Sequence, residues 1–197
     1  MGSQFRRLPG REGLQLGCGH NRSMASSSTE NNMTEPRGGP ISRPAVDTIQ
    51  LHLAVLSTGD WSKSYAAAVD HVRRDVYGSL ASSLANNGAP RNMSEPDAVD
   101  SCCAYRMERT AAGDVELYIS TLLPYAALLV VNKAGQAVFA KGTLWRRYAE
   151  ELLGSGICLL TGADCRASVT VLGATAPVFE VLFTETFDAP EDEPLSA

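Results

Sequence analysis

The chain has 197 residues, of which 44% are hydrophobic, with a formal net charge of -5 and a pI near 5.2. This is enough for one ordinary domain with a hydrophobic core and polar ends. The acidic balance excludes the clustered basic surface that non-specific nucleic-acid binding requires. No run approaches the roughly 18 consecutive apolar residues of a membrane-spanning helix. We therefore expect neither nucleic acid nor a membrane as a partner.

The N-terminal segment, residues 1–46, is predicted to be disordered. From residue 17 to 47 it consists mainly of Gly, Ser, Asn, Pro and Arg, which cannot bury enough apolar surface to offset the entropy of ordering. The absence of a signal-like apolar stretch and the odd number of cysteines, five, favour a reducing, cytoplasmic location. A mitochondrial location is the alternative, because residues 1–28 contain arginines and only one acid, and they resemble a transit peptide.

A single domain is predicted over residues 47–185, and an acidic flexible tail over residues 186–197. The domain is expected to open with a strand at 48–57, where large apolar residues alternate with smaller or polar ones. The alternating residues are Ile49, Leu51, Leu53 and Val55.

A long helix is predicted next, from residue 58 to 88, because apolar residues recur at three- and four-residue steps. They are Trp61, Tyr65, Val69, Val72, Val76, Leu80 and Leu84. Gly78 lies inside this pattern and indicates a kink or close packing.

The period then changes to two, which predicts two hairpins. The first joins residues 103–108 to 115–120 through an "AAGD" turn, and the second spans 125–141 with the turn "NKAG". A short helix follows at 143–154, capped by Thr143 and ended by Gly154. Three short strands, "ICLL", "ASVTVLG" and "PVFEVLFTE", are expected to complete the domain.

This order predicts an α+β fold: a mostly antiparallel sheet of about six to eight strands with one long and one short helix packed on it. The motifs of nucleotide-binding folds are missing. "GSGICLLTG" follows a helix and spaces its glycines wrongly for a dinucleotide turn, and no phosphate loop or esterase elbow occurs. We predict no cofactor.

The neighbouring cysteines Cys102 and Cys103 are candidates for chemistry or for packing. In a strand they face opposite ways, and Cys103 shares its face with Tyr105 and Met107, which favours packing. Cys158 and Cys165 are not spaced as a metal-binding pair, so no metal site is predicted.

The domain contains two histidines that could act as a base. His52 lies on the more polar side of the first predicted strand, and His71 lies beside Asp70 on the polar side of the long helix. A pairing of His52 with Cys103 stays open, because strands distant in sequence can be neighbours in a sheet. No catalytic residue is predicted.

The short helix at 143–154 carries charges that its dipole does not favour. Arg146 and Arg147 lie near its positive N-terminal end, and two glutamates lie near its C-terminal end. With Trp145 and Tyr148 they form a set typical of protein-binding surfaces, so we expect a partner-binding site at Trp145, Arg146, Arg147 and Tyr148.

These observations favour a non-enzymatic protein-interaction or assembly subunit of a multiprotein complex, bound to other proteins or to a second copy. The alternative is a small enzyme with a cysteine- or carboxylate-based active site. A third hypothesis is a carrier protein that holds a small apolar ligand between the sheet and the long helix.

Overall fold

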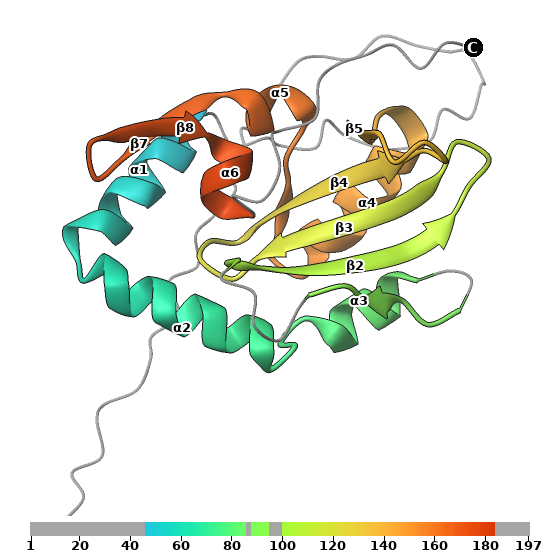
Figure 1. The fold of residues 1–197 in the computed structure, drawn as a ribbon, viewed down its shortest axis with the longest axis horizontal. Coiled ribbons are helices and arrows are strands. Elements are labelled where there is room, and N and C mark those ends of the chain that lie inside the picture. Colours follow the sequence, from blue (N-terminus) through green and yellow to red (C-terminus); the bar gives the residue numbers. More distant parts are fainter. Residues whose placement is uncertain (1–45, 86–87, 95–99, 184–197) are drawn as a thin grey trace, which may run out of the picture. The chain divides into compact units, whose positions relative to one another are not determined.

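The computed structural model describes residues 46–85, 88–94 and 100–183. The predicted disordered segment, apart from residue 46, and the predicted acidic tail lie outside these ranges. The described part contains a six-stranded sheet, a two-stranded sheet and six helices (Figure 1). The predicted α+β class is therefore confirmed, with more helices than the two that we expected.

The larger sheet follows the order β1-β2-β3-β4-β5, and each pair of neighbours is antiparallel. β5 pairs with the end of β4, and β6 pairs in parallel with its beginning, so both use the same edge of β4. Both predicted hairpins, β2–β3 and β4–β5, are confirmed. The strands are β1 (Arg91–Asn92), β2 (Cys102–Arg109), β3 (Asp114–Ser120), β4 (Tyr125–Val131), β5 (Ala137–Phe139) and β6 (Cys158–Leu159).

The first hairpin contains a β-bulge between Arg106 and Glu108. Before the bulge Arg106 lies opposite Glu116, and after it Glu108 lies opposite Val115. A bulge adds one residue to one strand, so the side chains beyond it exchange faces. Glu108 is thereby turned to the face opposite Arg106, toward the helix that follows β5.

The first element is a helix, α1 (Val46–Thr58), and the predicted strand at 48–57 is wrong. Ile49 and Leu53 are fully buried, whereas Leu51 and Val55 are 61% and 64% exposed. Burial thus repeats every four residues rather than every two, which is the helical period. The alternation of apolar residues in the sequence is compatible with a strand and with a helix.

The predicted long helix is divided into α2 (Trp61–Arg73) and α3 (Gly78–Leu84). The chain turns between them at Asp75, whose φ of +50° is incompatible with a continuing right-handed helix. Gly78, which the sequence marked as a kink or close contact, is the first residue of α3. The short predicted helix is confirmed as α4 (Gly142–Gly154).

The last part of the described chain also differs from its prediction. β7 (Ser168–Val171) and β8 (Ala174–Pro177) form the two-stranded sheet, preceded by α5 (Gly162–Arg166). The predicted strand "PVFEVLFTE" is wrong, because α6 (Val178–Leu182) starts directly after Pro177. Val178, Phe179 and Leu182 are all buried, at the three- and four-residue steps of a helix.

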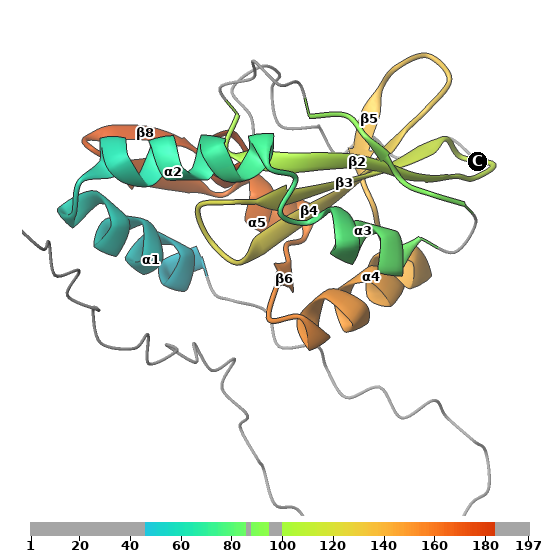
Figure 2. The ribbon, with the colours of Figure 1, turned by 90° about the horizontal axis from the view of Figure 1, so that it is seen from below.

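The two faces of the larger sheet pack against different elements. One face contributes Cys102, Tyr118, Tyr125 and Leu129 to a cluster with residues of α1, α5, β7 and α6. The opposite face carries Tyr105, and Figure 2 shows α3 and α4 together on one side of the sheet. The sheet is therefore buried between two layers, as the continuously apolar β4 indicates.

Candidate functional site

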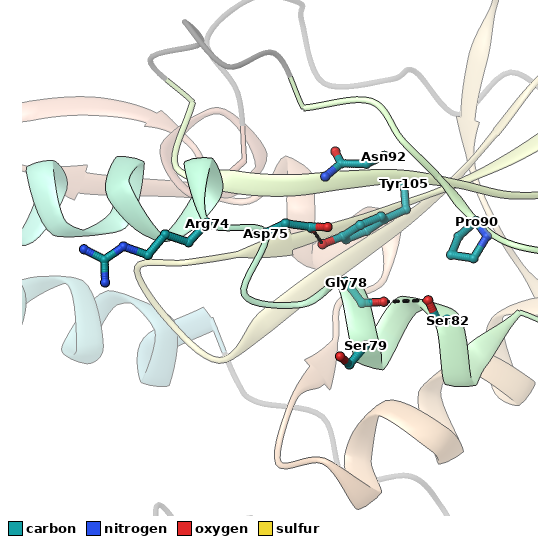
Figure 3. Close-up of a pocket in the computed structure, with 8 residues that line it drawn as sticks. All are labelled: Arg74, Asp75, Gly78, Ser79, Ser82, Pro90, Asn92 and Tyr105. Carbon is teal, nitrogen blue, oxygen red and sulfur yellow. Dashed lines mark hydrogen bonds between the residues drawn. The ribbon is translucent and has the colours of Figure 1, made fainter.

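A polar cleft of about 610 Å³ lies where the turn between α2 and α3 meets β1 and β2 (Figure 3). This volume is within the range of roughly 300–1,000 Å³ that small-molecule sites occupy. The lining residues are Arg74, Asp75, Gly78, Ser79, Ser82, Pro90, Asn92 and Tyr105.

Asp75 adopts the left-handed backbone conformation, with φ at +50°. Aspartate tolerates this region better than most residues, because its short polar side chain bonds locally. A Cβ atom on Gly78 would lie 2.5 Å from Asp75 Oδ2, so any other residue at position 78 would require the Asp75 side chain to shift. The absence of a side chain at Gly78 is therefore compatible with the observed position of the carboxylate.

Tyr105 reaches the cleft from the sheet. Its side chain is buried, with 1% of the residue exposed, and its hydroxyl donates a hydrogen bond to Asp75 Oδ1. Burial raises the pKa of Tyr105 strongly, and the bond to Asp75 raises it further. The phenol thus keeps its proton at physiological pH and donates a hydrogen bond to the carboxylate.

Other hydroxyl and amide groups of the cleft are partly engaged as well. Ser82 Oγ donates to the carbonyl oxygen of Gly78 at 2.8 Å, and Asn92 Oδ1 accepts from the backbone N–H of Ser94 at 2.8 Å. Arg74 is directed away from the Tyr105–Asp75 pair and forms an ion pair with Asp70 (Figure 3). The one charge at the Tyr105–Asp75 pair is therefore the carboxylate.

Cys103 lies on the same face of β2 as Tyr105 and is fully buried, as the packing interpretation expected. Burial raises the pKa of the Cys103 thiol, and it raises the pKa of Cys102 well above the usual value. Both groups are neutral thiols at physiological pH, and neutral thiols are poor nucleophiles.

The structure does not bring His52 to Cys103. His52 Nδ1 is 2.8 Å from the hydroxyl of Tyr125, and the two rings stack with centroids 6.0 Å apart. Tyr125 belongs to the face of the sheet that carries Cys102, so the sheet separates the histidine from Cys103. His71 is exposed on α2.

The four residues of the expected partner-binding site on α4 have different surroundings. Tyr148 is 1% exposed, and its hydroxyl donates to Glu108 Oε1 at 3.2 Å. Arg147 forms an ion pair with the same carboxylate, and Trp145 Nε1 donates to the carbonyl oxygen of Leu160 at 3.1 Å. Arg146 is exposed. A contact of α4 with a partner stays a prediction, for which Arg146 is the most accessible of the four side chains.

A second exposed feature lies where α1 meets the β7–β8 hairpin. The Gln50 side chain bonds the backbone of Thr170, at the edge of β7. Leu51 and Val55 project from the outer side of α1, and Leu172 occupies the hairpin turn with 66% exposure. We refer to Leu51, Val55 and Leu172 as the Leu172 surface.

Sequence reasoning missed both features. The cleft depends on the break at Asp75, for which Gly78 was the one available signal. The Leu172 surface was hidden because its α1 residues were assigned to the inner face of a strand. "VLGA" does contain a hairpin signal, a two-residue turn with glycine second, but leucine precedes the glycine where asparagine is favoured.

Within residues 46–85, 88–94 and 100–183, no three His, Cys, Asp or Glu side chains are grouped so that they could hold a metal ion. In the same ranges no helix has the length and apolar character needed to cross a bilayer. Comparison of the chain with protein-family models, with curated proteins and with solved structures gave no match.

Proposed function

We propose that the protein is a non-enzymatic interaction or assembly subunit that binds another protein through the Leu172 surface. The observation that carries the proposal is Leu172 itself, which is 66% exposed and has a φ of +52°. A left-handed conformation costs an L-residue with a branched side chain about 1–2 kcal/mol.

The turn geometry does not require this leucine. Leu172 and Gly173 have φ values of +52° and +84°, the pattern of a type I′ turn, for which Asn-Gly is the favoured pair. An exposed leucine here lowers stability and gains no burial within the chain. Residues that lower stability in this way are typical of sites kept for function.

Two further exposed apolar residues lie on α1, the helix that the Gln50–Thr170 hydrogen bonds join to β7. Leu51 and Val55 are one helical turn apart on it. A contiguous exposed apolar area commonly marks a contact with another protein, and we propose that these three side chains contribute to one.

Charge favours a different protein over a second copy as the occupant. α1 carries Asp47 and no Lys or Arg, and the chain as a whole has a net charge of -5. Two copies would bring like charges together, whereas a partner with a basic rim would be complementary.

The structure gives little support to the alternative of an enzyme with a cysteine-based active site. Burial raises the pKa of Cys102, Cys103 and Cys165, so all three thiols are poorly ionised at neutral pH. The carboxylate that lines the cleft, for a carboxylate-based enzyme, is Asp75. A cytoplasmic location stays a prediction.

Site-specific photo-crosslinking tests the proposal. A photoreactive side chain is introduced into the full chain at position 55 or 172, and as matched controls at 153 on α4 and 76 beside the cleft. Leu153 and Val76 are also exposed apolar residues, 37% and 47% accessible. We expect one protein to crosslink from positions 55 and 172 and not from the controls.

The crosslinked protein, once purified, should bind the wild-type chain and bind the Leu172→Asn variant at least about tenfold more weakly, as loss of a central apolar contact predicts. Equal binding by a folded Leu172→Asn variant would refute the proposal. Crosslinks between two copies would replace the partner protein by a homodimer, and crosslinks from position 153 alone, on α4, would support the α4 surface instead.

A further inference from the structure

We infer that the cleft at Asp75 and Tyr105 binds an organic cation through its N–H groups, such as the ammonium or guanidinium group of a small molecule or of a side chain. This inference is independent of the proposed function, because it concerns a different surface and different residues.

The first argument is the direction of the hydrogen bonds in the cleft. The Tyr105 hydroxyl donates a hydrogen bond to Asp75, and the Ser82 hydroxyl donates one to the carbonyl oxygen of Gly78. Each hydroxyl has one proton and two lone pairs, so both oxygens keep acceptor capacity, of which the Cys103 side chain engages part at Tyr105. A ligand that bonds these two oxygens must supply donors.

The second argument is charge. The Asp75 carboxylate adds a negative acceptor directly beside the phenol oxygen, and Arg74 does not neutralise it, because its guanidinium pairs with Asp70 and is directed away (Figure 3). Hydrogen bonds between an ionised acceptor and a cationic donor are about twice as strong as neutral ones. The pair therefore favours a cationic donor over a neutral one.

The third argument is the identity of the residue in the turn between α2 and α3. Asp75 has a positive φ, and its carboxylate occupies the space beside Gly78, where a Cβ atom would lie 2.5 Å from Oδ2. Asparagine would suit the left-handed conformation as well and would still accept the Tyr105 hydrogen bond. Neither the turn nor the Tyr105 hydrogen bond therefore requires a negative charge at position 75.

The inference is tested by NMR titration of the full chain with butylguanidinium, butylammonium and the neutral analogue butylurea. We expect saturable shifts of the backbone amide signals of Asp75, Gly78 and Ser82 with the two cations and none with butylurea. Arginine- and lysine-containing peptides, titrated in the same way, distinguish a side-chain ligand from a free amine by their tighter binding.

Two variants and one control distinguish an effect on cation binding from an effect on the stability of the fold. Asp75→Asn should keep the thermal midpoint within a few degrees and weaken the cations at least about tenfold, because the charge is lost while the acceptor remains. Tyr105→Phe, which removes the second acceptor, should weaken them by a smaller factor. Asp60→Asn, which changes a carboxylate at the start of α2 that is not among the cleft residues, should bind as the wild type does.

Three results would overturn the inference. They are equal shifts with butylurea, undiminished binding of the cations by a folded Asp75→Asn variant, and saturable binding of Ca²⁺ with no response to either organic cation. If Asp75→Asn does not fold, the Tyr105→Phe titration decides on its own, since wild-type affinity in that variant would remove the phenol from the site.

Discussion

The side-chain amide of Gln50 pairs with the backbone of Thr170 as a neighbouring strand would. Its nitrogen donates to the Thr170 carbonyl oxygen at 2.9 Å, and its oxygen accepts from the Thr170 N–H at 2.8 Å. β7 has β8 on its other side, so these two bonds satisfy an otherwise open strand edge. One side chain thus joins α1 to the two-stranded sheet.

We expect replacement of Gln50 to loosen this junction. Gln50→Ala removes both hydrogen bonds and should lower the free energy of unfolding by about 1–2 kcal/mol, as two exposed neutral bonds predict. Gln50→Glu, of nearly equal size, keeps an acceptor but loses the donor, and should also destabilise. Urea unfolding measures both, and wild-type stability in the two variants would show that the pairing contributes nothing.

The hairpin turn should become more stable when its leucine is replaced. Leu172→Asn creates an Asn-Gly pair in a turn where both residues have positive φ, and should raise the free energy of unfolding by about 1 kcal/mol. Leu172→Val is the control, because a β-branched residue is less tolerated there and should destabilise. Thermal unfolding in which the asparagine variant melts below the wild type would contradict the role assigned to this turn.

The ion pair between Glu108 and Arg147 distinguishes the two arginines of α4. Arg147→Ala leaves the Glu108 carboxylate, whose side chain is 11% exposed, with Tyr148 as its remaining partner, and should cost about 1–3 kcal/mol. Arg146→Ala changes an exposed side chain and should alter stability by less than about 0.5 kcal/mol. Chemical denaturation of the two variants makes the comparison, and equal losses would contradict it.

The cysteines should differ in reactivity. Cys102, Cys103 and Cys165 are buried with raised pKa values, whereas Cys158 is half-buried. Among the four cysteines of the described residues, alkylation at neutral pH followed by peptide mass spectrometry should label Cys158 first, and the other three only when guanidinium unfolds the chain. Rapid labelling of Cys103 in the folded protein would reopen the cysteine-based enzyme alternative.

The buried tyrosines predict a loss of stability at alkaline pH. Burial raises the pKa of Tyr148 to about 12 and that of Tyr105 and Tyr118 further, whereas an unfolded tyrosine titrates near 10. Above pH 10 the unfolded chain releases phenol protons that the folded chain retains, so stability falls as pH rises from there toward 12.

Urea unfolding between pH 8 and 11.5 measures this decline, and Tyr148→Phe should reduce its slope. Phenolate absorbance near 295 nm provides the control, because the buried tyrosines should titrate only with unfolding. A free energy of unfolding that is constant across the whole range would contradict the assigned pKa directions.

The hairpins could be predicted because their burial follows the local pattern of the sequence. Tyr105 and Met107 alternate with Ala104 and Arg106, and this alternation is the period of a strand with one face in the core. The helix α4 could be predicted for the same reason, because its buried residues Tyr148 and Leu152 are four positions apart.

The misassigned elements were decided by packing that is distant in sequence. In α1, Ile49 and Leu53 meet residues of β7 and α6, more than a hundred positions away, and local pattern alone left strand and helix equally possible. The same holds for the cleft, because Asp75 and Tyr105 are 30 residues apart and meet only after the helix breaks. Gly78 indicated the helix break, but no local feature of the sequence indicated that Tyr105 would meet Asp75 at this break.

The separation between Gln50 and Thr170, 120 residues, bears on the order in which the chain folds. The strands from β2 to β5 pair with neighbours across short turns, so their contacts close small loops at little entropic cost. The junction of α1 with β7 closes a much longer loop, which costs more entropy. We therefore expect the meander of β2 to β5 to form before α1 docks, so that the element that carries Leu51 and Val55 is attached late in folding.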